Sequence, residues 1–138
     1  MAKYLNEPKN ETAFVRWIAE SAKAMRGRVT KLHGHSMQRS GISDIWFVVP
    51  GIEPMHGWLE AKVGNRGFTS TQEIFMDEAR TGDCIALGVR WRAGFLSLYH
   101  NADTCLHSVE CKNIDAEKFW ELIRIYGAES IAMTRSGF

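Results

Sequence analysis

The sequence contains few cysteines and no long apolar run, and both absences narrow the kind of protein that it can be. Its three cysteines are an odd number without a CxxC pair, so no disulfide framework is expected and reduced thiols are the default. No apolar run approaches the roughly 18–20 residues that cross a bilayer. The opening MAKYLNEPKNETAF has no apolar stretch typical of a signal peptide. We therefore expect an intracellular, cytoplasmic protein without a membrane partner.

The sequence also has little net charge, but its basic residues are unevenly placed. A hydrophobic content of 45% in 138 residues, without repeats or a linker, predicts a single domain over 1–138. The net charge is only +1, yet six basic residues and one acid, Glu20, lie between Arg16 and Arg39. Such a cluster is typical of a surface that contacts a phosphate backbone. The alternative is a solvated helix face whose long side chains lie along apolar surface.

The spacing of apolar residues predicts alternating helices and strands. Helical periodicity predicts a helix over 10–26, capped by Asn10 and ended by Gly27. The other expected elements are strands at 28–32, 43–49, 57–63, 83–91 and 94–100, and helices at 70–82 and 114–130. The order αβββαββα predicts an α/β fold in which helices flank a mixed β-sheet.

Two acids and a lysine stand at the ends of two expected strands. Asp44 enters the first of these strands and Glu60 lies near the end of the second, so antiparallel pairing would bring them together. Because side chains alternate along a strand, Glu60 and Lys62 would share one face and Ala61 the other. Carboxylates with few other ligands suit Mg²⁺ or Mn²⁺, which activate water and polarise a phosphodiester. The alternative is a set of solvated or paired residues at a sheet edge.

The residues around this set resemble the PD-(D/E)xK nuclease superfamily. The resemblance lies in Glu11 of the first helix, G-x-S-D at 41–44, E-A-K at 60–62 and S-T-Q at 70–72. Within the superfamily the chain is most similar to VRR-NUC domains and to archaeal Holliday-junction resolvases. Short phage-type VRR-NUC domains share an approach to the aspartate like HGHSMQRSGISD. The similarity covers a core at about 10–91 and leaves a C-terminal extension at about 92–138.

The resemblance implies a role for each matching residue. Asp44 and Glu60 would be the metal-binding carboxylates, and Lys62 would be the catalytic lysine. The backbone carbonyl of Ala61 would be a further metal ligand. Glu11 would reach the same site from the first helix as a metal or water ligand.

Two positions match the family pattern less closely. Gln72 would correspond to the family's glutamine at the start of the second helix, but a capping box formed by Thr69 with Gln72, or by Ser70 with Glu73, also accounts for such residues. The family usually has proline before the aspartate, where this sequence has Ser43. That change removes rigidity from the chain but no metal ligand.

The resemblance also implies an activity. We expect a restriction-endonuclease-like fold and a metal-dependent endonuclease that hydrolyses DNA, with preference for branched or four-way-junction substrates, acting as a homodimer because paired cuts need two sites. A phage-encoded enzyme acting in a host cell fits this expectation. The residues expected to contact DNA are Arg28, Lys31, His35, Arg39 and Arg66. The alternatives are an inactive DNA-binding or assembly module of the same fold, and a nuclease for nicked or linear DNA or for RNA.

Other chemistry-bearing residues favour structural roles. The patterns His33-x-His35 and Cys105-x-His107-x3-Cys111 lack the paired spacing of zinc sites. Trp46, Phe47 and Trp58 are expected in the core or in dimer contacts, since aromatic residues are common in strands. The apolar residues of 94–100 and 114–127 are candidates for dimerisation.

Overall fold

A computed structural model describes residues 8–31, 45–51, 53–65 and 67–137 of the chain. The helices are α1 (Glu11–Ala24), α2 (Ser70–Thr81) and α3 (Ala116–Arg135), with a 3-10 helix, η1, at Cys111–Asn113. The strands are β1 (Arg28–Lys31), β2 (Ile45–Val49), β3 (Met55–Val63), β4 (Ile85–Arg92), β5 (Phe95–Asn101) and β6 (Thr104–Glu110). Among the described helices, none is long and apolar enough to cross a bilayer.

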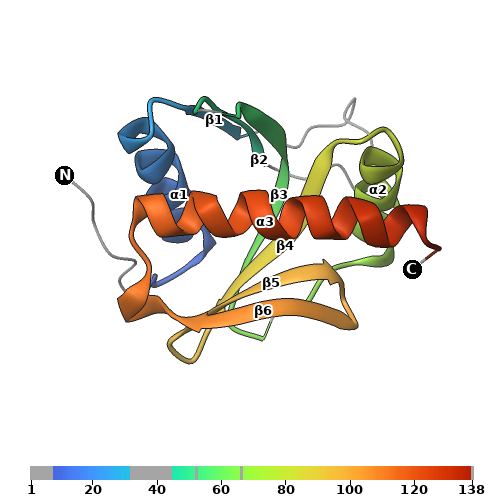
Figure 1. Ribbon diagram of the computed structural model, residues 1–138. Helices are drawn as coiled ribbons and strands as arrows, with labels where there is room; N and C mark the ends of the chain where they lie inside the picture. The colour runs from blue at the N-terminus through green and yellow to red at the C-terminus, as the bar shows by residue number, and fades with distance from the viewer. Residues whose placement is uncertain (1–7, 32–44, 52, 66, 138) are drawn as a thin grey trace.

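The strands form one mixed sheet in the order β1-β2-β3-β4-β5-β6. Every neighbouring pair is antiparallel except β3 and β4, which are parallel because α2 carries the chain back between them. Figure 1 shows α3 running across the sheet, with α1 near its beginning and α2 near its end. The predicted α/β class and the core order of helix, three strands, helix and strand are confirmed.

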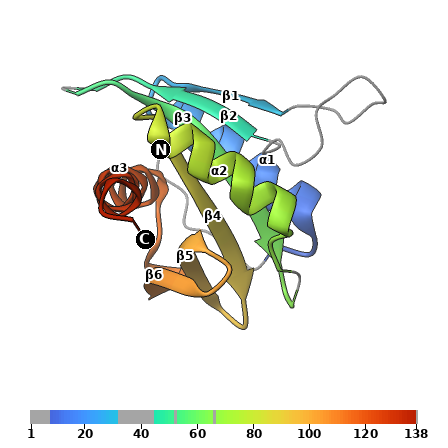
Figure 2. The same cartoon turned by 90° about the vertical axis from the view of Figure 1, so that its right-hand side faces the viewer.

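Side chains on β2 and β3 separate into two faces. On one face Ile45, Phe47, Leu59 and Ala61 are fully buried among apolar residues of α1 and α3. The ring of Phe47, for example, lies 5.0 Å from that of Trp120 on α3. Burying each large apolar side chain contributes roughly 1.5–3 kcal/mol, so this face fixes the register of both strands. Figure 2 shows α2 in front of the sheet and α1 behind it.

The α2 helix is attached to the sheet and to α3 by a buried arginine. Arg80 is 2% exposed. Its Nη1 donates to the carbonyl of Ala86 and its Nε donates to Thr134 Oγ1, both at 2.9 Å. Burial lowers the pKa of Arg80 from its ordinary value, while the nearby Asp77 carboxylate raises it. Since a guanidinium keeps its charge in proteins, these bonds hold α2 in place through a cation.

One strand and several element boundaries differ from the sequence predictions. The strand β6 was not predicted, because Thr104–Glu110 alternates weakly in hydrophobicity and gains its structure from pairing with β5. The helix α3 continues to Arg135 rather than ending at 130. The helix α1 ends before Gly27, with Arg26 at a left-handed φ of 61°. Gly27 is needed because a Cβ there would lie 2.6 Å from the Val48 carbonyl oxygen.

The segments expected to mediate dimerisation mostly face the protein's own core. Leu96 and Leu98 of β5, and Phe119 and Ile123 of α3, have no exposed surface. Only the exposed side chains of these segments, such as Phe95 and Ile125, are therefore available to a partner.

Gly57→Ala is expected to lower the free energy of unfolding by about 1–3 kcal/mol, because crowding a packed site forces the neighbouring strand to shift. A Cβ at Gly57 would lie 2.3 Å from the Ile85 carbonyl oxygen. Gly67→Ala is the control, since nothing lies within 4 Å of its Cβ position. Urea denaturation monitored by circular dichroism measures both, and equal midpoints would contradict this close approach of β3 and β4.

Candidate active site

Glu60 and Lys62 form a buried pair on the sheet face opposite the α1 side of the core. They are 3% and 6% exposed, and Glu60 Oε2 lies 3.8 Å from Lys62 Nζ. Alternation along β3 places them on the same face as Trp58, whose ring contacts Phe75 of α2 at 5.2 Å. Two ionisable side chains of opposite charge are thus held together on a central strand, partly beneath α2.

Stability does not account for this pair. A distance of 3.8 Å exceeds the about 2.7–2.9 Å of a charge-assisted hydrogen bond, so Lys62 forms an ion pair with Glu60 without a hydrogen bond. Removing two charges from water is costly, and replacing a buried ion pair with apolar residues is often neutral or stabilising. The pair is therefore weak evidence for added stability, and its position makes it a candidate for a functional role.

The other predicted ligands occupy different positions. Ala61 is fully buried with its methyl group in the core, which leaves its backbone carbonyl as the one group that can act as a ligand. Glu11 is half-buried in the first turn of α1, a helix that packs against the core side of β3. Asp44 lies outside the described residues; it precedes Ile45, which pairs with Leu59 next to Glu60. The described residues contain no group of three or more His, Cys, Asp and Glu side chains that could hold a metal.

Gln72 forms the capping box of α2. The Thr69 backbone N–H donates to Gln72 Oε1 at 2.9 Å, and the Gln72 backbone N–H donates to Thr69 Oγ1 at 3.2 Å. Of the two capping boxes that the sequence allowed, the structure therefore forms Thr69 with Gln72. The side-chain oxygen of Gln72 is used by this cap, and the structure gives no separate evidence of a catalytic role.

Arg90 on β4 was missed by the sequence analysis. In the parallel register Lys62 is opposite Arg90, which places both on one face of strands about 4.8 Å apart. Arg90 is half-buried, its Nη2 donates to the Tyr99 hydroxyl at 2.7 Å, and its guanidinium carbon lies 5.0 Å from the Tyr99 ring centroid. Within the described ranges, no carboxylate forms an ion pair with Arg90. The sequence gives no signal for this neighbour, since the register of a parallel pair is set by the helix between its strands.

Two aromatic rings, those of Phe68 and Tyr99, lie over the strands next to the Glu60–Lys62 pair. Gly88 is opposite Glu60 in the register, and Phe68 fills the space where a Gly88 side chain would be, with Cζ 2.3 Å from an added Cβ. The Phe68 ring also contacts Tyr99 at 5.6 Å. The Phe68 ring therefore covers the β4 position that lies opposite Glu60.

The residues predicted to contact DNA are only partly described. Arg28 and Lys31 are exposed on β1, where a phosphate backbone could reach them. His35, Arg39 and Arg66 lie outside the described residues.

Comparison with known proteins identifies a similar fold at a distant level. No family model and no curated protein matches the sequence. Among solved structures, the chain is similar to Archaeoglobus fulgidus Hjc, a Holliday junction resolvase from an archaeal hyperthermophile. The similarity covers 72% of this chain and 87% of that chain, with 10% sequence identity and a TM-score of 0.48. A likeness of this size carries no argument about activity, which depends on the residues of the site.

Gln72→Ala and Thr69→Ala are each expected to lower the free energy of unfolding by about 1 kcal/mol, because each removes half of the capping box. Ser70→Ala is the control, since Ser70 begins α2 without taking part in the cap. Urea denaturation measures the effect. An unchanged urea midpoint for Gln72→Ala would show that the hydrogen bond from the Thr69 N–H to Gln72 Oε1 does not stabilise the protein.

Proposed function

We propose that the protein is a divalent-metal-dependent endonuclease that hydrolyses DNA phosphodiester bonds at the Glu60 end of β3. The observation that carries the proposal is the buried Glu60–Lys62 pair beside Arg90, a guanidinium without a carboxylate partner among the described residues. A phosphate group would complement the charge of both cations, and a metal ion would complement that of the Glu60 carboxylate.

The proposed cofactor is Mg²⁺ or Mn²⁺. The donor chemistry fits a hard cation, because Glu60 offers carboxylate oxygens, the ligand type that Mg²⁺ and Mn²⁺ prefer. In this proposal Glu60 holds the ion, and the family resemblance implies Asp44, the Ala61 carbonyl and Glu11 as the other ligands; of these, Glu11 comes from α1, on the core side of β3. When bound, the ion would lower the pKa of a water molecule and polarise the phosphodiester.

The chain's own cations act on the phosphate. Lys62 Nζ orients the attacking water or stabilises the negative charge that develops on the phosphoryl oxygens. That stabilisation is stronger in a buried site than in water because the local dielectric is lower. Arg90, held by Tyr99, donates to the oxygens of the same or the next phosphate, for which a planar guanidinium is well suited.

Selectivity for branched DNA and assembly as a homodimer are finer parts of the proposal. Symmetric cuts in a four-way junction require two sites and hence two protomers. Exposed apolar side chains that could contribute to such an interface include Phe95 at 45% and Ile125 at 48%. Cleavage of a four-way junction beside linear, nicked and single-stranded DNA tests the preference, and light scattering measures the mass.

Glu60→Gln and Lys62→Met are each expected to reduce metal-dependent cleavage by roughly 100-fold or more, the size of effect seen when one charge-stabilising group is removed. Labelled DNA incubated with Mg²⁺, Mn²⁺ or EDTA provides the measurement. Glu110 and Lys112 supply matched controls, because they repeat the E-x-K spacing as a 3.1 Å pair on the surface. Glu110→Gln and Lys112→Met should cleave like the wild type.

Two results would reject this mechanism. Wild-type cleavage by the Glu60→Gln and Lys62→Met proteins would remove both residues from the chemistry. Binding of DNA by the wild type without cleavage of any substrate in either metal would favour the alternative of an inactive DNA-binding module.

Arg90→Gln is expected to weaken substrate binding by roughly 10-fold, since a hydrogen bond to a charged group contributes about 1.5–3 kcal/mol. The rate of cleavage at saturating substrate should change less, because Lys62 and the proposed metal site remain. Arg124→Gln is the control, because Arg124 is exposed on α3, which covers the opposite face of the sheet. Steady-state kinetics separate KM from kcat. An unchanged KM would remove Arg90 from phosphate binding.

A further inference from the structure

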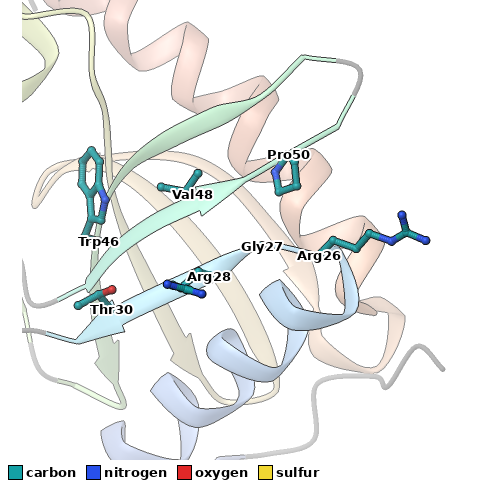
Figure 3. A pocket seen from close by; sticks show the side chains of 7 residues that line it. All are labelled: Arg26, Gly27, Arg28, Thr30, Trp46, Val48 and Pro50. Carbon is teal, nitrogen blue, oxygen red and sulfur yellow. The ribbon is translucent and has the colours of Figure 1, made fainter.

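An open groove lies along β1, β2 and the turns that flank them (Figure 3). Its volume is about 470 Å³, within the roughly 300–1,000 Å³ typical of ligand pockets. The residues that line it are Arg26, Gly27, Arg28, Thr30, Trp46, Val48 and Pro50. We call this feature the β1–β2 groove.

The β1–β2 groove combines positive charge with apolar surface. Among the described residues that line it, Arg26 and Arg28 are charged and none is an acid. Trp46 and Val48 supply the apolar part, and Val48 is 44% exposed. Figure 3 shows Arg28 and Thr30 from β1 beside Trp46 and Val48 from β2, with Arg26 at the rim and directed outward. A ligand that complements this surface carries negative charge and flat apolar groups.

The groove lies on the same face of the sheet as the candidate active site. Thr30 pairs with Trp46, and Trp46 pairs with Trp58, which is two residues from Glu60 on β3. At about 3.4 Å per residue and 4.8 Å between strands, Trp46 stands roughly one strand across and 7 Å along from Glu60. A polymer that occupies the groove is therefore close enough to enter the site.

Trp46 is held in position by other aromatic side chains. Its ring lies 4.9 Å from that of Trp58 and 5.4 Å from that of His56. Phe47 is fully buried in the core, as expected, but Trp46 is half-buried and lines the groove. A fixed, partly open indole is a stacking platform, and stacking of one base on an aromatic side chain contributes about 1–3 kcal/mol.

We propose that the β1–β2 groove binds unpaired nucleotides of a DNA strand, with a base on Trp46 and phosphates at Arg28 and Arg26. Duplex DNA offers the edges of its bases in the grooves and not their faces, so it cannot stack on Trp46. Binding itself does not depend on catalysis. Only its consequence, the selection of DNA with single-stranded segments for cleavage, rests on the proposed nuclease function.

The test is the binding of fluorescein-labelled oligothymidylate of about ten nucleotides, a length within the site size of one single-strand-binding module. Fluorescence anisotropy in EDTA measures affinity without cleavage. Trp46→Ala is expected to weaken binding by about 10-fold and to leave an abasic oligomer of the same length unaffected. Arg28→Gln should weaken both oligomers and reduce the slope of log K against log salt by about 0.7. Arg92→Gln is the control, because Arg92 is exposed outside the groove.

A second pair of variants tests the groove independently in case Trp46→Ala does not fold. Val48→Glu places a negative charge in the groove at a side chain that is already 44% exposed. Ile74→Glu is the matched control, because it places the same charge on α2 at a side chain that is 56% exposed and does not line the groove. We expect Val48→Glu to bind oligothymidylate more weakly than the wild type, and the control variant to bind it equally well. The urea midpoints of both variants should lie near that of the wild type.

The outcomes separate this proposal from the nuclease proposal. The groove is rejected if neither Trp46→Ala nor Val48→Glu weakens oligothymidylate binding, or if Trp46→Ala weakens binding of blunt duplex as much as binding of oligothymidylate. Glu60→Gln should keep oligothymidylate binding while losing cleavage. Trp46-dependent binding by a wild type that cuts nothing would reject the nuclease alone. If the wild type cleaves DNA but Trp46→Ala binds oligothymidylate as tightly as the wild type does, the groove proposal alone is rejected.

Discussion

The parallel pairing of β3 with β4 is the constraint on which the rest of the structure depends. It joins Leu59 to Leu87 within the core, and on the opposite face it sets Lys62 beside Arg90. The pairing requires the chain to cross over through α2, and the buried Arg80 fixes that helix to β4 and α3. One set of backbone hydrogen bonds therefore determines both the core and the arrangement of charges.

The two faces of β3 carry different kinds of side chain. The core face gains stability from apolar burial, whereas the other face carries a buried ion pair that contributes little to folding. In the proposed function, a phosphate and a divalent cation would compensate these buried charges. The β1–β2 groove extends the same face outward, so binding and chemistry would share one continuous surface.

Much of the fold follows from local sequence patterns. Helical spacing and caps located α1 and α2, because Asn10 and Thr69 bond to backbone N–H groups only a few residues away. The alternation of apolar and polar residues located the central strands, because this pattern also depends only on residues that are close together in the sequence. β6 escaped prediction because its pairing with β5, and not its own weak pattern, makes it a strand. Similarly, Gly27 was assigned to a helix end, although the approach of β2 is what requires it.

The sequence by itself determined that Glu60 and Lys62 share a face of one strand, since strand geometry alone imposes that alternation. It also supplied the family resemblance from which the metal-dependent chemistry is proposed. Only the tertiary structure decided that this face is buried, that Arg90 and Tyr99 stand beside Lys62, and that Trp46 opens into a groove. These features depend on strand register and helix packing, which arise from contacts between residues far apart in the chain.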